Sequence, residues 1–420
     1  MFTKTTLPNG LRVVTHPMPG AKSVAVMVMF AVGSRYETKT TNGIAHFAEH
    51  MFFKGTDRRP TAKDISAEVD GIGGEFNAFT SKEFTGYYIK CAGEHRAIAL
   101  DVLSDQLLSS RFDPEEIERE KGVIVEELNM YLDTPRDHVD SVYETLLYGD
   151  QPLGWDVIGT KDTIRAANRE TFTGYLHDWY TPRRTVVGAA GDVNGDFVAE
   201  VAEKFGAVED RASGDMAPVE FVQTEPRAAI ETRDSDQAHL RLGVRGIQTT
   251  SPDRYVMQVM TAVLGGGMSS RLFIEVRERL GLAYYVYAYH QGYHDTGTLF
   301  AQAGVDTERI DQAVGTIAQE FRKMAAEPVT DEELRRCKNF LKGRMVLGLE
   351  DPRGLLMFGL RREVLENKVA EIDEILDGIE AVTVEDIQRL ARQVIVDDGL
   401  NFGLVGPFDD EQRFLDILAG

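Results

Sequence analysis

Two histidines and a glutamate within five residues form the strongest chemical signal in the sequence. Residues 46–50 read His-Phe-Ala-Glu-His. On a helix, positions i and i+4 share a face, so His46 and His50 point in the same direction. Two imidazoles one turn apart can occupy two corners of a zinc tetrahedron. The spacing therefore predicts a metal site with Glu49 beside it, where a general base can take the proton of a metal-bound water.

The order of these residues also carries information. His-x-x-Glu-His inverts the commoner His-Glu-x-x-His order and is known as the inverzincin motif. The alternative is a chance spacing on an exposed helix, which a chain of this His and Glu content produces in roughly one or two cases in a hundred. A third ligand on another element would make the motif much more specific.

A carboxylate on a separate helix is the expected third ligand. Glu120 and Glu127 are seven residues apart and so share one helix face, whereas Glu126 must point elsewhere. One member of the inward pair would bind the metal and the other would orient a ligand or the water. The alternative is an acidic, solvated face, which composition favours for the glutamates at 115–118.

The elements that must position these residues follow from local signals. A helix is expected over residues 43–54, stopped by Gly55, and a second one starts at Asp113-Pro114 and runs to about Leu132. Residues 75–80 and 85–91 alternate like strands. A further helix is expected to begin at Asp192.

The second half of the chain repeats the first. Residues 113–136 align without gaps with residues 330–353, with paired glutamates at the start and Pro-Arg at the end. A stretch rich in charge, Pro, Gly and Ser separates the halves. We therefore expect an α+β fold of two similar duplicated domains, 1–212 and 225–420, each a mostly antiparallel sheet packed with helices.

Composition limits the classes of function. The net charge of −22 disfavours nucleic-acid binding and favours basic partners, although it also serves solubility alone. The two cysteines, Cys91 and Cys337, exclude a thiolate zinc site and are typical of a reducing compartment. We find neither a signal peptide nor an apolar run long enough to span a membrane, so we expect a cytoplasmic protein.

Four stretches of the sequence resemble the pitrilysin or insulinase (M16) metallopeptidases. They are HFAEHMFFKGT at 46–56, FNAFTSKEFT at 76–85, EREKGVIVEE at 118–127 and DQPLGWDVIG at 150–159. The resemblance covers essentially the whole chain. It is closest to the short, two-domain bacterial members and to the catalytic subunit of mitochondrial processing peptidase.

The resemblance implies a role for each residue of the predicted site. It makes His46, His50 and Glu127 the zinc ligands and Glu49 the catalytic base. Glu120 matches a family carboxylate that does not bind the metal itself but orients one of its ligands. The implied reaction is hydrolysis of a peptide bond by a metal-activated water.

The family pattern also implies how a peptide binds. The strand at Asn77, Ala78 and Phe79 would pair with the substrate, which adds to the sheet as a β-strand. Such pairing recognises the extended peptide backbone and depends little on the peptide sequence. In VRERLGLAY at 276–284, Arg277 would hold a peptide carbonyl and Tyr284 would stabilise the oxyanion. Spacing alone would favour a helix end and a half-buried tyrosine.

Two departures from a symmetric, processing-type enzyme are visible. The repeat places Arg344 opposite Glu127, so the second half lacks the metal and one Zn²⁺ per chain is expected. Processing peptidases hold a substrate arginine with an acidic pair. Asp137 matches the first acidic position, but Ser141, with Asp140 beside it, stands at the second.

The expected function is that of a zinc endopeptidase acting on short or unfolded peptides, basic ones included. Family members enclose substrate in four such domains, so two chains should assemble as a homodimer, with a heterodimer containing an inactive homologue as the alternative. A non-catalytic core subunit and a peptide-binding module of the same fold are the rival functions. Cleavage, and its loss when Glu49 is replaced, separates the peptidase from both.

Overall fold

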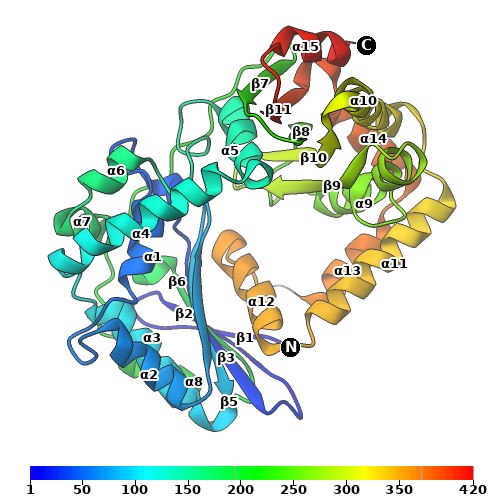
Figure 1. The fold of residues 1–420 in the computed structure, drawn as a ribbon. Coiled ribbons are helices and arrows are strands. Elements are labelled where there is room, and N and C mark those ends of the chain that lie inside the picture. The colour runs from blue at the N-terminus through cyan, green and yellow to red at the C-terminus, as the bar shows by residue number, and fades with distance from the viewer. Residues whose placement is uncertain (194, 370, 420) are drawn as a thin grey trace. The chain divides into compact units, whose positions relative to one another are not determined.

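Two sheets, each covered by helices, make up the regular structure of the chain (Figure 1). A computed structural model describes residues 1–193, 195–369 and 371–419. The chain divides into two packing units. Unit 1 comprises Met1–Leu128, Asp156–Ala217 and Val346–Ile372, and unit 2 comprises Asn129–Trp155, Pro218–Met345 and Asp373–Gly420. The predicted α+β class with two similar domains is confirmed.

The sheet of unit 1 has six strands in the order β1-β2-β6-β3-β5-β4. Only the β2–β6 pair is parallel. The central strand β3 is almost entirely apolar because both of its faces are covered. The strands are β1 (Thr3–Thr6), β2 (Arg12–Pro17), β3 (Ser23–Phe30), β4 (Glu75–Thr80), β5 (Thr85–Ala92) and β6 (Thr185–Gly191).

Several helices of unit 1 begin at a side-chain cap. Thr61 and Asp64 form a capping box at the start of α2. The helix predicted to begin at Asp192 starts at Phe197 instead, because the side chain of Asp196 accepts the hydrogen bond that caps it. The helices are α1 (Ile44–Met51), α2 (Ala62–Gly71), α3 (Arg96–Ser109), α4 (Pro114–Leu132), α6 (Lys161–Ala166), α7 (Arg169–Trp179), α8 (Phe197–Phe205) and α12 (Pro352–Glu366).

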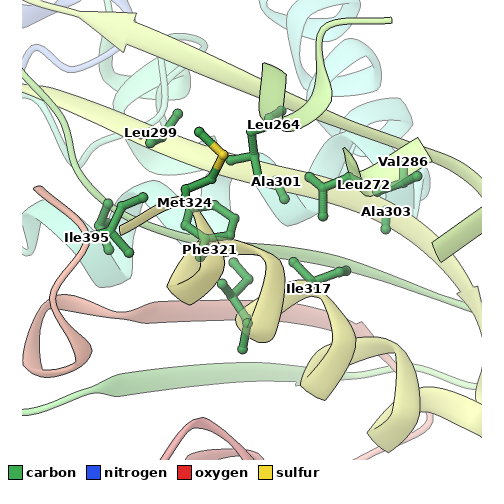
Figure 2. Close-up of a cluster of buried hydrophobic side chains, with 14 of the residues drawn as sticks. Leu264, Leu272, Val286, Leu299, Ala301, Ala303, Ile317, Phe321, Met324 and Ile395 are labelled. Carbon is green, nitrogen blue, oxygen red and sulfur yellow. The ribbon is translucent and has the colours of Figure 1, made fainter. Parts of the chain in front are cut away.

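Unit 2 has a five-stranded sheet in the order β7-β11-β8-β10-β9, with β7–β11 as its parallel pair. Figure 2 shows its core, where Ile317 and Phe321 of α10 face Leu299 and Ala301 of β10. The strands are β7 (Arg227–Thr232), β8 (Gln237–Arg245), β9 (Ala283–Gly292), β10 (Gly297–Asp306) and β11 (Asn401–Gly406). The helices are α5 (Pro135–Tyr148), α9 (Arg254–Gly265), a π-helix (Phe273–Arg279), α10 (Ile310–Ala326), α11 (Asp331–Gly348), α13 (Ile372–Ala381), α14 (Val384–Val394) and α15 (Glu411–Ala419).

Each half of the sequence gives one helix to the other half's sheet (Figure 1). Helix α12 packs on β3 and β6 of unit 1, where Leu356 and Leu360 are buried in the core. Helix α5 packs on β8 and β11 of unit 2, and its buried Tyr143 hydroxyl lies 3.1 Å from Thr298 Oγ1. The packing units therefore differ from the predicted division into 1–212 and 225–420, because a single cut between these halves would separate each sheet from one of the helices that cover it.

The length and polarity of the described helices can be compared with what a membrane-spanning helix needs. Each helix in residues 1–193, 195–369 and 371–419 is too short or too polar to cross a lipid bilayer.

Candidate metal centre

The helix α1 carries the two histidines on one face. It begins after Gly43, which has a φ of +92° and would collide with Ile158 O at 2.5 Å if it carried a Cβ. The rings of His46 and His50 lie 4.7 Å apart between centroids. Phe47 and Met51, which point away from these rings, are buried in the core and fix the orientation of the helix.

Helix α4 brings Glu127 to the two rings. Its Oε1 lies 3.7 Å from His46 Nε2, and its Oε2 lies 3.4 Å from His50 Nε2. Around a tetrahedral zinc ion with bonds of about 2.1 Å, two ligand atoms lie about 3.4 Å apart. The three side chains therefore fit a zinc ion in donor chemistry and in spacing. Glu126, the neighbour on the helix, is exposed.

In the protein without metal, the two imidazoles differ in their affinity for a proton. Burial lowers the pKa of His46 to about 4, so its ring stays neutral at pH 7, the form that binds metals. Burial also lowers the pKa of His50, but hydrogen bonds with Glu120 and Glu127 outweigh it and raise that pKa to about 9. Within the described ranges, His46, His50 and Glu127 form the one group of three such side chains close enough to share an ion.

Glu120 contacts His50 at the ring nitrogen that faces away from Glu127. Its Oε1 lies 2.9 Å from His50 Nδ1, and its Oε2 accepts a hydrogen bond from Lys54 Nζ at 2.5 Å. Burial raises the pKa of Glu120, but these two partners outweigh it and hold the pKa below its usual value. An ionised Glu120 favours the His50 tautomer that keeps Nε2 free for a metal. Lys54 did not emerge from the sequence analysis, although it is four residues after His50, just beyond the end of α1.

The carboxylate of Glu49 points toward strand β4. Its Oε2 accepts a hydrogen bond of 2.5 Å from the hydroxyl of Thr80, the last residue of that strand. Burial raises the pKa of Glu49, and the hydrogen bond from Thr80 opposes this effect. A carboxylate with a raised pKa, next to two imidazoles that could bind a metal ion, has the properties of a general base.

Strand β4 also carries the predicted peptide-binding residues Asn77, Ala78 and Phe79. It is the last strand of the sheet, so one edge pairs with β5 and the other has no partner among the described residues. The side chain of Asn77 is exposed, whereas the Phe79 ring packs over Gly86, where an added Cβ would meet it at 2.1 Å. The Phe79 side chain therefore packs on the sheet itself.

Unit 2 holds the predicted clamp residues. The guanidinium of Arg277, in the π-helix, lies 5.7 Å from the ring centre of Tyr284, which is 77% exposed. Asp137 lies in the first turn of α5. Asp140 forms an ion pair with Arg241, so this second acidic residue already has a cationic partner.

A buried carboxylate that the sequence analysis missed holds the start of α1. Glu37 is 5% exposed and accepts hydrogen bonds from the backbone N–H of Gly43 and Ala45, each at 2.8 Å, and from Asn42 Nδ2 at 3.0 Å. Gly43 has no side chain to cap the helix, so Glu37 satisfies its first N–H groups from a distant position. No short-range pattern marks this role, because Glu37 lies outside the usual capping positions.

Glu37 makes stability depend on pH. Burial raises its pKa to about 8 from 4.5, although the three donors oppose this. Between these values the folded protein keeps a proton that the unfolded chain has lost, so rising pH should destabilise the fold by up to about 1.4 kcal/mol per unit. We expect urea unfolding at pH 5 to 8 to show this slope in the unchanged protein and a smaller slope in Glu37→Gln. Parallel curves would contradict the assignment.

Known proteins match almost the whole chain. Residues 12–161 match the family profile described as insulinase (peptidase family M16), and residues 166–341 match the profile described as peptidase M16 inactive domain. The chain is 39% identical to the uncharacterized zinc protease YmxG of Bacillus subtilis, over 95% of this chain and 97% of that protein. It is 38% identical to the uncharacterized zinc protease SCO5738 of Streptomyces coelicolor, over 99% and 92% of the two chains.

Solved structures share the fold. A protease from Helicobacter pylori superposes with a TM-score of 0.90 at 22% identity, covering 97% of this chain and 99% of its own. A Pseudomonas fluorescens structure described as a peptidase M16 inactive domain has a TM-score of 0.89 at 18% identity, covering 98% and 99%.

Proposed function

Because the chain belongs to the insulinase family of peptidases, M16, we propose that it is a zinc-dependent endopeptidase that cleaves short or unfolded peptides. One observation carries the proposal: two imidazoles and a distant carboxylate converge with the spacing of a tetrahedral site. The names of its relatives support zinc as the ion.

In the proposed enzyme, His46, His50 and Glu127 hold one Zn²⁺ and Glu120 orients His50. When bound, the ion supplies Lewis acidity, which polarises the scissile carbonyl and makes water a stronger acid. The carboxylate of Glu49 takes the proton of the attacking water and passes it to the leaving amine. Its raised pKa supports both steps, because such a group accepts and returns a proton more readily near neutral pH.

The proposed substrate is an extended peptide that pairs with the open edge of β4 at Asn77, Ala78 and Phe79. Because this pairing uses the peptide backbone, it supports cleavage of peptides of many different sequences. Arg277 and Tyr284 are also proposed to bind peptide, and the exposure of Tyr284 supports a role in contact with a ligand. A homodimer is the proposed assembly, because one chain carries both sets of residues.

Removal and return of the metal tests the function directly. We expect a chelator to abolish cleavage of a mixed peptide library and a stoichiometric addition of Zn²⁺ to restore it, with about one ion bound per chain. Zinc binding should also raise the melting temperature, because the ion binds the folded state only. A Glu127→Gln variant should bind zinc weakly and stay inactive after the same addition.

A matched variant tests whether the loss of one negative charge on α4 is by itself enough to abolish activity. Glu126→Gln removes the same charge from the adjacent, exposed position of α4 and should keep both zinc binding and cleavage. A zinc-loaded protein that cleaves no peptide would favour the non-catalytic subunit. Cleavage that persists in full without bound metal would contradict the proposal outright.

A further inference from the structure

We infer that Thr80 is a positioning residue that couples a peptide on the β4 edge to the orientation of the Glu49 carboxylate. This inference rests on the proposed function and adds a residue to it. The Thr80 hydroxyl donates to Glu49 Oε2 at 2.5 Å. Among the described residues, the carboxylate has no other hydrogen bond, so this contact selects which of its oxygens remains free.

The alternation of strand β4 explains why Thr80 reaches the helix. Side chains at every second position share a face, so Phe76, Ala78 and Thr80 point the same way. Phe76 packs against Phe53, just beyond the end of α1, with ring centres 5.6 Å apart. Strand β4 therefore contacts α1 and the residues just after it through both Phe76 and Thr80.

The end of β4 is itself held in place. Beyond Thr80, the backbone carbonyls of Ser81 and Lys82 accept hydrogen bonds from Ser34 and Arg35 at 3.0 and 2.8 Å. The Arg35 side chain makes a buried ion pair with Glu83 at 2.6 Å. These contacts fix the turn between β4 and β5, so the Thr80 hydroxyl is presented from a rigid position.

Thr80 links strand β4 to the proton transfer proposed for Glu49. The β4 edge is where a peptide is proposed to pair, so the strand that would hold the peptide also holds the Glu49 carboxylate through Thr80. With Oε2 occupied by the hydroxyl, Oε1 is the oxygen that takes the proton from water. Without the hydroxyl, the carboxylate can rotate, and fewer bound peptides meet a correctly oriented base.

Two substitutions separate this role from a structural one. Thr80→Val keeps the shape of the side chain and removes the hydroxyl, whereas Thr80→Ser keeps the hydroxyl. With a fluorogenic peptide of about ten residues, we expect Thr80→Val to lower kcat by about 10- to 100-fold with KM within about twofold. Thr80→Ser should stay within about threefold of the unchanged protein.

Measurements without turnover complete the test. Zinc content and the Kd of the same peptide for the metal-free protein should be unchanged in Thr80→Val. Thr5→Val, on the edge strand β1 of the same sheet, is the matched control and should change neither kcat nor binding.

The outcomes distinguish the inference from the function on which it rests. An unchanged kcat in Thr80→Val, a loss confined to KM, or an equal loss in Thr80→Ser would overturn the role of Thr80 while leaving the peptidase intact. A zinc-loaded, unsubstituted protein that cleaves nothing would overturn the proposed function and this coupling with it.

Discussion

Replacement of Glu49 by Gln should lower kcat by about 10²- to 10⁴-fold, the range expected when a general base is removed. Glutamine has nearly the same size, and its amide oxygen can still accept the hydrogen bond from Thr80. Zinc content and peptide affinity should therefore stay close to those of the unchanged protein. The measurement is steady-state cleavage of a peptide identified in the library assay, with zinc quantified in the same samples.

This expected pattern distinguishes a base from a ligand. A substituted ligand would lose the metal and the activity together, whereas Glu49→Gln should lose only the activity. The result that counts against the assignment is cleavage by Glu49→Gln at the original rate. Because Glu49 lies between the two histidines in sequence, retained zinc is the necessary control for every inactive variant at this position.

Residues 1–212, expressed alone, should fail to fold into a stable zinc-binding domain. Their sheet is covered by α12, which lies more than a hundred residues beyond that fragment. Helix α12 buries Leu355, Leu356, Leu360 and Val364 in the core of unit 1. At about 1.5–3 kcal/mol for each buried side chain, their loss removes about 6–12 kcal/mol, comparable with the whole stability of a domain. Circular dichroism and resistance to proteolysis measure the outcome.

The contribution of α12 can also be measured in the complete chain. Leu360→Ala, at a fully buried position, should lower the free energy of unfolding by about 2–5 kcal/mol. Arg361→Ala, on the exposed face of the same helix, should change it by less than about 1 kcal/mol. A stable, zinc-binding 1–212 fragment would show instead that the predicted linear domain is autonomous.

Features that depend on short-range order were predictable from the sequence. The spacing of His46 and His50 sets both rings on one helix face wherever the helix lies. Asp113-Pro114 marks the start of α4, and the alternation in residues 75–80 predicts β4 with correct bounds. The same helical geometry paired Glu120 with Glu127, which the structure places on the inner face of α4.

Only the tertiary structure decided which distant groups meet. Thr80 and Glu37 act on α1 from other segments, and neither has a spacing that a local pattern can report. The sequence pattern did not predict the exchange of α5 and α12 for the same reason: each helix carries apolar side chains, and these do not say which sheet the helix covers. The amino-acid sequence determined the local geometry of the motif, because a helix repeats every few residues. The fold determined its partners, because packing joins segments that lie far apart along the chain.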